Sequence, residues 1–552
     1  MRRNRALLVA VVGVVLGFCG SAARSDETNI ILDLASPAAH AIHHPIGTSS
    51  REAQTLFDRG LALVWAFNHA AAIKTFLLAA AADPAAPMPY WGIAYALGPN
   101  INMPAMPEML LAADQALKEA QARAANGTPS DRAYIEALAA RYADDPNAER
   151  APLDRAYADA TATLVERQPE DLDAKTLHAE AVLDLHPWLW WSRDGKPEPG
   201  IKEAIAELKA VLAANPDHIG ANHLLIHALE ESPNPKKADS AAEHLAAMAG
   251  HAGHLIHMPA HVQAHMGDFA ACAESNSKAI EADEAYIAAS GVIGVYPLMY
   301  LGHNYQFLAY CEQMAGRKAA TLEAVEGLAR HLAKHGLEIP PIADLVTDYV
   351  GMLPALLAVR FGEWDRALQI AQPAAGARVA TAFWHYARGV AYLGKDLVSE
   401  ASDERAALAA LLPGIPPEES YGANNAGAAM AALALDELDG RIAVAQGRFG
   451  RAIKLFEQAV AKQDALAYDD PPPWYHPVRE TLGGLLLKTG RPAEAEKLFR
   501  ADLKRNPGSG RSLWGLWQSL VDQGKSGQAD KAEAAFDKAW AKADIKLKAG
   551  EF

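Results

Sequence analysis

Helical hairpins that recur with a period of about 34 residues constrain this chain more than any other feature of its sequence. Alanine-rich segments with apolar residues at helical spacing alternate with short breaks of Gly, Pro, Asp and Asn. No stretch keeps the alternating pattern of a strand, so we expect no sheet. The pattern predicts an all-α superhelical solenoid of helix-turn-helix repeats, in which each pair buries its apolar face against its neighbours.

The clearest repeat lies near the C-terminus, where Leu482-Gly483 is followed by Gly490-Arg491-Pro492-Ala493-Glu494-Ala495, Phe499 and Asn506-Pro507. A similar order begins at Gly447-Arg448-Phe449 and continues through Ala452, Phe456 and Ala459. These motifs resemble the tetratricopeptide-repeat (TPR) family over most of residues 50–545. The Phe-Asn-His, Trp-Gly and His-Met-Pro-x-His signatures resemble those of exported bacterial TPR proteins. The resemblance implies that the first helix of each pair lines a concave groove.

The first residues are typical of a targeting segment. Arg2, Arg3 and Arg5 precede the apolar run Ala6–Phe18, which is too short to span a bilayer. We therefore predict a signal peptide at residues 1–25, a periplasmic or secreted location, and no transmembrane segment after its removal. The remaining organisation is predicted as an extended arm (26–50), a TPR-like solenoid (51–545) with histidine-rich central repeats (217–316), and a short tail (546–552).

Charge and cysteine content exclude some classes of protein. The formal net charge is -16, which disfavours nucleic-acid binding, because phosphate backbones require clustered Lys and Arg. Beyond the signal peptide only Cys272 and Cys311 remain. Two cysteines do not make a disulfide framework, so two small buried side chains are favoured over a bridge between them.

The placement of the histidines is the most informative functional feature. His254, His257, His261 and His265 lie at spacings of three, four and four residues, which is the spacing of one helical face. They fall 13, 10, 6 and 2 residues before the turn at Gly267.

The neighbouring repeats repeat these offsets. His223 and His227 lie 10 and 6 residues before the turn at Pro233, and His303 lies 13 before the turn at Gly316. Glu231 lies 2 residues before Pro233, and one repeat upstream Glu180 and Asp184 take the positions of His227 and Glu231. If the offsets line a groove, as the TPR resemblance implies, these histidines face one channel from three adjacent helices.

Such a cluster predicts a transition-metal site. Equal offsets pair His223 with His257 and His227 with His261, which makes these four the expected ligands. The other candidates, acting as supporting or second-site ligands, are His254, His265 and His303, with Glu231 as a base or orienting group. All-imidazole ligation suits copper or zinc, and also iron. The function expected is that of a periplasmic metalloprotein, with metal-dependent oxidoreductase and hydrolase chemistry both open.

Two other hypotheses about the function of these residues stay open. The groove can bind a peptide or partner protein with histidines as polar contacts, or the chain can store or deliver metal without catalysis. Phe67-Asn68-His69 lies at no groove offset and is expected to cap or pack the first helical turn. The stiff connector Asp469–Pro477 is expected to dock its aromatic side chains between repeats, with His476 reaching a groove opening as the alternative.

Overall fold

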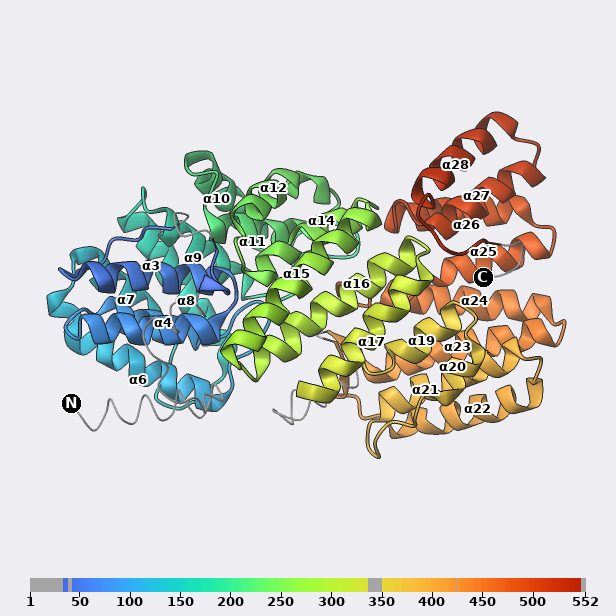
Figure 1. Ribbon diagram of the computed structural model, residues 1–552, viewed down its shortest axis with the longest axis horizontal. Helices are drawn as coiled ribbons and strands as arrows, with labels where there is room; N and C mark the ends of the chain where they lie inside the picture. Colours follow the sequence, from blue (N-terminus) through green and yellow to red (C-terminus); the bar gives the residue numbers. More distant parts are fainter. Residues whose placement is uncertain (1–32, 38–41, 336–349, 423, 548–552) are drawn as a thin grey trace. The chain divides into compact units, whose positions relative to one another are not determined.

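The computed structural model describes residues 33–37, 42–335, 350–422 and 424–547, and it is helical in nearly every part of them (Figure 1). The chain forms two compact units: residues 1–262 with 278–301, and residues 263–277 with 302–552. The repeat pattern of the sequence gave no indication of this division. The predicted signal peptide lies outside the described residues.

Unit 1 contains consecutive helical pairs followed by a short π-helix. Its elements are α3 (Arg51–Trp65), α4 (His69–Ala82), α5 (Met88–Ala96), α6 (Pro107–Arg123), η1 (Ala124–Asn126), α7 (Pro129–Ala139), α8 (Arg150–Arg167), α9 (Leu172–Leu183), α10 (Ile201–Ala214), α11 (Ile219–Glu230), η2 (Pro235–Ala238), α12 (Asp239–Met248), α13 (Gly253–His257) and η3 (Tyr296–Leu301). Helices α14 (Pro259–His265) and α15 (Phe269–Ser290) each contribute residues to both units.

Unit 2 continues the same architecture. Its elements are α16 (Gly302–Met314), α17 (Lys318–His335), α19 (Leu353–Arg360), α20 (Trp364–Gln369), α21 (Arg378–Gly394), α22 (Val398–Leu411), η4 (Leu412–Gly414), β1 (Ser420–Tyr421), β2 (Asn425–Ala426), α23 (Gly427–Ala445), α24 (Phe449–Ala465), α25 (Val478–Lys488), α26 (Pro492–Arg505), α27 (Gly510–Asp522) and α28 (Ser526–Ala539). The two-residue strands pair antiparallel, and with two isolated bridges they are the departures from the all-α prediction among the described residues. The predicted fold class is confirmed.

Local sequence explains how the first helical pair begins and turns. The side chains of Ser50 and Asn68 accept hydrogen bonds from the backbone N–H groups of Ala53 and Ala71, which caps α3 and α4. Between the two helices Phe67 has φ 56°, a left-handed conformation that is uncommon for a bulky residue. The prediction that Phe67-Asn68-His69 packs and caps this turn is confirmed.

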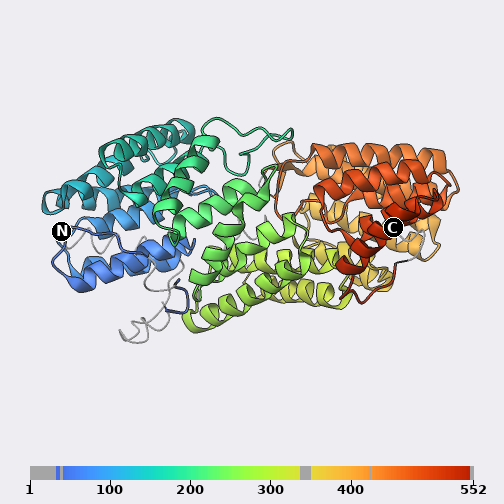
Figure 2. The same ribbon diagram turned by 90° about the horizontal axis from the view of Figure 1, so that it is seen from above.

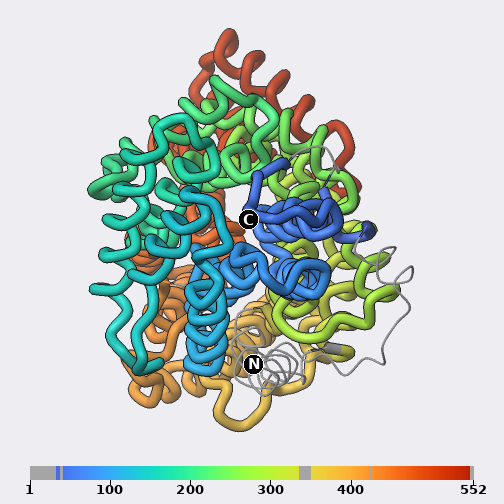
Figure 3. Tube along the Cα trace, turned by 90° about the vertical axis from the view of Figure 1, so that its left-hand side faces the viewer, coloured from blue at the N-terminus to red at the C-terminus, as the bar shows by residue number. Residues whose placement is uncertain are grey.

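The course of the chain in unit 1 brings segments far apart in sequence together. Helix α11 packs against both α9 and α3, so the chain returns to its first helical pair (Figures 2 and 3). Gly220 makes this close approach feasible, because a Cβ there would lie 2.6 Å from Cδ2 of Trp65. Residues around Trp65 and Phe67 therefore face α11, where His223 and His227 lie.

The two cysteines correct one prediction. Cys272 and Cys311 form a disulfide in unit 2, with Cα atoms 6.0 Å apart, although the sequence favoured two unpaired side chains. Both are fully buried, as expected. The pairing depends on the approach of α15 to α16, which a spacing of 39 residues does not reveal. Among the described residues, none of the helices is long and apolar enough to cross a membrane.

Candidate metal centre

Five of the predicted histidines lie together in the interior of unit 1. Helix α11 carries His223 and His227 one turn apart, α13 carries His254 and His257, and α14 carries His261. None of the five is more than 2% exposed. Five buried imidazoles need hydrogen-bonding or metal partners. Transfer of a polar group from water to the interior without such a partner costs roughly 2–7 kcal/mol of free energy.

Oxygen acceptors orient three of these rings. Nδ1 of His223 lies 2.6 Å from the carbonyl oxygen of Trp65, and because a carbonyl can only accept, Nδ1 carries the proton. Nδ1 of His261 lies 3.0 Å from Oε2 of Glu230, and Nδ1 of His227 lies 3.4 Å from Oε1 of the same carboxylate. In the neutral rings the other nitrogen, Nε2, then presents a lone pair.

The Nε2 atoms meet in the centre of the cluster. Nε2 of His223 lies 3.1 Å from Nε2 of His254, and Nε2 of His257 lies 2.9 Å from Nε2 of His261. Ring nitrogens of His223, His227 and His254 all lie within 4.8 Å of one another. This arrangement matches the usual metal-ligating histidine, whose second nitrogen donates to a carbonyl or carboxylate.

Aromatic side chains enclose the cluster. The Phe67 ring lies 4.4 Å from His223 and 5.4 Å from His254, measured between centroids. Tyr300, from the π-helix η3, lies edge-on to His254 at 4.9 Å. Trp188, which also has a positive φ, lies 5.4 Å from His227. Since these rings exclude water, charges inside the cluster are poorly screened.

The electrostatics keep the imidazole of His223 neutral. Burial lowers the pKa of His223 well below its usual value, and the neighbouring His227 lowers it further. Burial also lowers the pKa of His69, which lies beside Phe67, to about 4. His223 is therefore a neutral nitrogen donor, and one carboxylate, Glu230, lies close to the neighbouring His227 and His261.

The predicted pairing of the histidines is partly wrong. His227 and His261 are neighbours, with ring centroids 5.4 Å apart, as the equal offsets predicted. His223 contacts His254 rather than His257. Met258 separates α13 from α14, although it keeps right-handed helical backbone angles (φ -50°, ψ -38°).

Two of the predicted ligands belong to unit 2. His265 lies 3.2 Å from both the hydroxyl of Tyr468 and Oδ2 of Asp470. His303 packs edge-on against Phe307, with centroids 5.5 Å apart. The participation of His265 and His303 in metal binding stays a prediction.

The carboxylate of the site is Glu230 and not Glu231. Glu231 is half-buried, accepts a hydrogen bond from the backbone N–H of Trp191, and has its pKa raised to about 8 by burial and by the charge of Glu230. The upstream positions Glu180 and Asp184 form a separate polar cluster with Arg141 and Tyr95. An i, i+3 contact on α11 identifies Glu230, whereas counting from the turn did not.

Comparison with known proteins finds a similarity in the C-terminal part of the chain. Residues 443–520 match the family model described as tetratricopeptide repeat. This segment is therefore similar to a tetratricopeptide repeat. It lies in unit 2 and includes the motifs at Gly447 and Leu482 from which the resemblance was predicted. No curated protein gives a significant match.

Three solved structures with which the chain aligns are distant from it. The human IFIT1 dimer with m7Gppp-AAAA is 11% identical, with 79% of this chain and 87% of that chain covered and a TM-score of 0.33. Yeast Tom70 is 12% identical, with 90% and 93% covered and a TM-score of 0.31. The APC/C hetero-tetramer Cut9–Hcn1 is 13% identical, with 85% and 76% covered and a TM-score of 0.31. Scores this low say nothing about the ligands of this chain.

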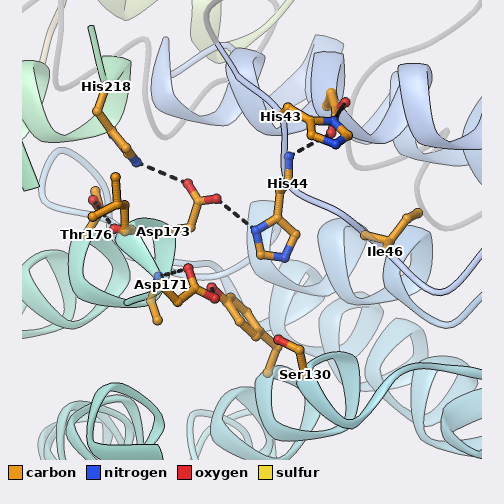
Figure 4. A network of polar contacts seen from close by, with 12 residues as sticks. His43, His44, Ile46, Ser130, Asp171, Asp173, Thr176 and His218 are labelled. Atoms are coloured by element: carbon orange, nitrogen blue, oxygen red, sulfur yellow. Dashed lines mark hydrogen bonds and ion pairs between the residues drawn. The ribbon is translucent and has the colours of Figure 1, made fainter. Parts of the chain in front are cut away.

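A second buried cluster ties the N-terminal arm to unit 1 (Figure 4). Asp173 accepts hydrogen bonds from Nδ1 of His44 (2.8 Å) and Nε2 of His218 (3.2 Å). Nδ1 of His218 accepts the cap hydrogen bond of α11 from Ala221, so its proton resides on Nε2. The second carboxylate, Asp171, accepts from the backbone of Ala174 and the hydroxyl of Tyr134. These carboxylate oxygens already accept hydrogen bonds. We therefore interpret the contacts of Asp173 with His44 and His218, called the clasp below, as structural rather than as a metal site.

The clasp predicts a pH dependence of stability. Burial opposes a charge on His44, but the hydrogen bond and charge of Asp173 outweigh it and raise the pKa of His44. The two histidines likewise hold the pKa of Asp173 well below its usual range, against the effect of burial. The contribution of His44 is complete below about pH 6.5 and is lost as pH rises through its raised pKa. That of Asp173 is present above about pH 4 and is lost in acid.

We therefore expect the His44→Gln variant to lose about 1.5–3 kcal/mol at pH 5.5, the usual worth of a hydrogen bond to a charged group, and less at pH 8.5. Urea unfolding at the two pH values measures the difference. His43→Gln is the matched control, because His43 pairs with Asp58 but its side chain is 67% exposed. An equal loss at both pH values would contradict the protonated clasp.

Proposed function

We propose that unit 1 binds a transition-metal ion through Nε2 of His223, His227 and His254. The observation that carries this proposal is the orientation of the rings. Trp65 and Glu230 hold the Nδ1 protons of His223 and His227, which directs the Nε2 lone pairs toward His254. Outer oxygen partners of this kind fix the tautomer that a metal requires.

Distances within the cluster support the same assignment. With metal–nitrogen bonds of about 2.0–2.1 Å, two ligands at a tetrahedral angle lie about 3.4 Å apart. The 3.1 Å between the Nε2 atoms of His223 and His254 is close to this value. Without an ion the same contact is an N–H···N hydrogen bond, so binding requires His254 to move its proton to Nδ1 and little further rearrangement.

Neutral imidazoles without a thiolate suit copper, zinc or iron. A metal-dependent oxidoreductase or hydrolase also needs a coordination position open to substrate. Here the ligands are buried and surrounded by Phe67, Tyr300 and Trp188. We therefore favour a role in holding metal over catalysis.

Elemental analysis tests the proposal. Purified full-length protein, dialysed against metal-free buffer, is expected to retain copper, zinc or iron in at least equimolar amount. The variant with His223, His227 and His254 replaced by Gln is expected to retain at least one equivalent less. The control His244→Gln removes a histidine whose side chain is 41% exposed and should change nothing. Wild-type protein that neither contains nor takes up any of these metals would refute the proposal.

A second role, in protein interaction, is favoured by the tetratricopeptide repeat at residues 443–520. Stacked helical repeats present extended surfaces that bind partner proteins or peptides. This repeat belongs to unit 2, whereas the proposed ligands belong to unit 1. Partner binding by unit 2 should therefore persist when the metal is removed with a chelator.

We also propose that the protein functions in the periplasm or outside the cell. The signal-peptide pattern of residues 1–25 and the Cys272–Cys311 disulfide both support this location, because disulfides persist mainly in oxidising compartments. Fractionation of the producing cell, with antibody detection of the processed chain, tests it.

A further inference from the structure

Two histidines of the cluster form a pair of their own beside the proposed ligands. Nε2 of His257 and Nε2 of His261 approach to 2.9 Å, and the two rings lie nearly perpendicular with centroids 4.7 Å apart. The rings are 0% and 1% exposed. Histidines four residues apart that direct ring nitrogens to one point are a recurrent chelating arrangement on helices.

His257 and His261 lie next to the proposed ligands His223, His227 and His254, and no histidine belongs to both sets. His254 and His257 stack with centroids 5.8 Å apart, and His227 and His261 are 5.4 Å apart. Each set therefore has its own Nε2–Nε2 contact, one at His223–His254 and one at His257–His261. A single ion with bonds of about 2.1 Å cannot satisfy five rings at these separations.

Glu230 connects the two sets. One carboxylate oxygen, Oε1, lies 3.4 Å from Nδ1 of His227, and the other, Oε2, lies 3.0 Å from Nδ1 of His261. The side chain is fully buried, so its negative charge compensates positive charge on either side. Contacts of this kind favour the tautomer in which Nδ1 carries the proton and Nε2 carries the lone pair.

We infer that unit 1 holds two metal ions, the second bound between His257 and His261, with Glu230 orienting one ligand of each ion. This inference rests on the proposed function and adds the number of ions and the residue that links them. Glu230 is a positioning residue here, since its oxygens contact the Nδ1 atoms and not the metal. The second ion takes at least two imidazole nitrogens, which suits copper or zinc.

Counting ions per chain tests the inference on the full-length protein. Apo wild-type chain titrated with Cu²⁺ or Zn²⁺ against a coloured chelator is expected to bind two equivalents before free metal appears. His257→Gln with His261→Gln should bind one, and Gln is chosen because it retains volume and hydrogen bonding. Glu230→Gln should still bind two, each about 10–100-fold more weakly, as outer partners of metal ligands usually require. Far-UV circular dichroism verifies that each variant is folded.

The outcomes separate this inference from the proposed function. No binding by the wild-type chain refutes the proposed function. One equivalent in the wild-type chain leaves that function intact and overturns the second ion. Two equivalents that persist in the His257, His261 double variant also overturn it. The wild-type titration needs no variant, so the inference stays testable even if the double variant does not fold.

Discussion

Replacement of Trp474 by alanine is expected to destabilise unit 2 by about 3–5 kcal/mol, the usual cost of deleting a buried aromatic side chain. Trp474 lies in the connector between α24 and α25 and is 2% exposed. Its ring packs against Phe383 at 5.8 Å and Tyr386 at 5.4 Å between centroids. Loss of the ring leaves a cavity among these side chains, which close packing does not refill.

The same substitution removes a hydrogen bond to a buried charge. Nε1 of Trp474 donates to Oε2 of Glu437, whose other oxygen contacts His476 and Arg441. Burial alone would raise the pKa of Glu437, but its contacts with His476 and Arg441 hold it well below its usual range. A carboxylate kept ionised in the interior needs every donor, so the hydrogen-bond loss adds to the cavity.

Hydrogen exchange on peptides from α21 and α23, followed by mass spectrometry, reports on this unit alone. Trp474→Phe is the matched control, because it keeps most of the buried ring and removes the donor. It should cost about 1–3 kcal/mol, the penalty of an unsatisfied buried group. Equal protection in wild type and Trp474→Ala would show that the connector does not support the repeats. The prediction that the connector docks its aromatic side chains between repeats is confirmed in unit 2, where His476 contacts Glu437.

The helical spacing of the histidines predicted much of the candidate site. His223 and His227 lie one turn apart on an uninterrupted helix, as their offsets predicted, but every residue of α11 is buried, so both lie in the interior of unit 1. Their partner His254 was expected only as a supporting ligand, because offsets along one helix do not show which ring of a neighbouring helix a side chain will contact.

Other parts of the site depend on contacts between distant segments. Phe67 enters the histidine cluster from the turn between α3 and α4, in a left-handed conformation that its sequence does not encode. The Trp65 carbonyl that orients His223 is a backbone group 158 residues away, and no side-chain pattern identifies it. The clasp between His44 and Asp173 joins residues 129 apart for the same reason. The periodicity of the sequence predicts which residues share one face of a helix. Which residues of other helices that face contacts depends on the course of the chain.

Replacement of Arg141 by methionine is expected to destabilise unit 1 by about 3–5 kcal/mol, the cost of breaking a buried ion pair from one side. The Arg141 side chain is 1% exposed, and Nη2 donates to Oδ2 of Asp184 at 2.6 Å and to the Pro99 carbonyl at 2.7 Å. Its guanidinium also lies over the Tyr157 ring, 4.5 Å from the centroid. Methionine fills part of the volume, so the expected loss is mainly electrostatic.

The acidic partners determine the size of this effect. Burial raises the pKa of Asp184, and the neighbouring Glu180 raises it further, while Arg141 is the cation that opposes both. Without Arg141, two buried carboxyl groups on the last turn of α9 must lose their charge or draw in water. Removing the negative charge together with the positive one should therefore restore stability.

The double variant Arg141→Met with Asp184→Asn is expected to recover at least half of the stability that the single variant loses. Hydrogen exchange on peptides from α7 and α9 measures both, with Arg155→Met as the control, because Arg155 is exposed on α8. If the double variant is as unstable as Arg141→Met alone, the loss comes from packing against Tyr157 and not from uncompensated charge. Since α9 packs against α11, the single variant should also lower metal uptake at His223 and His227, and the double variant should restore it.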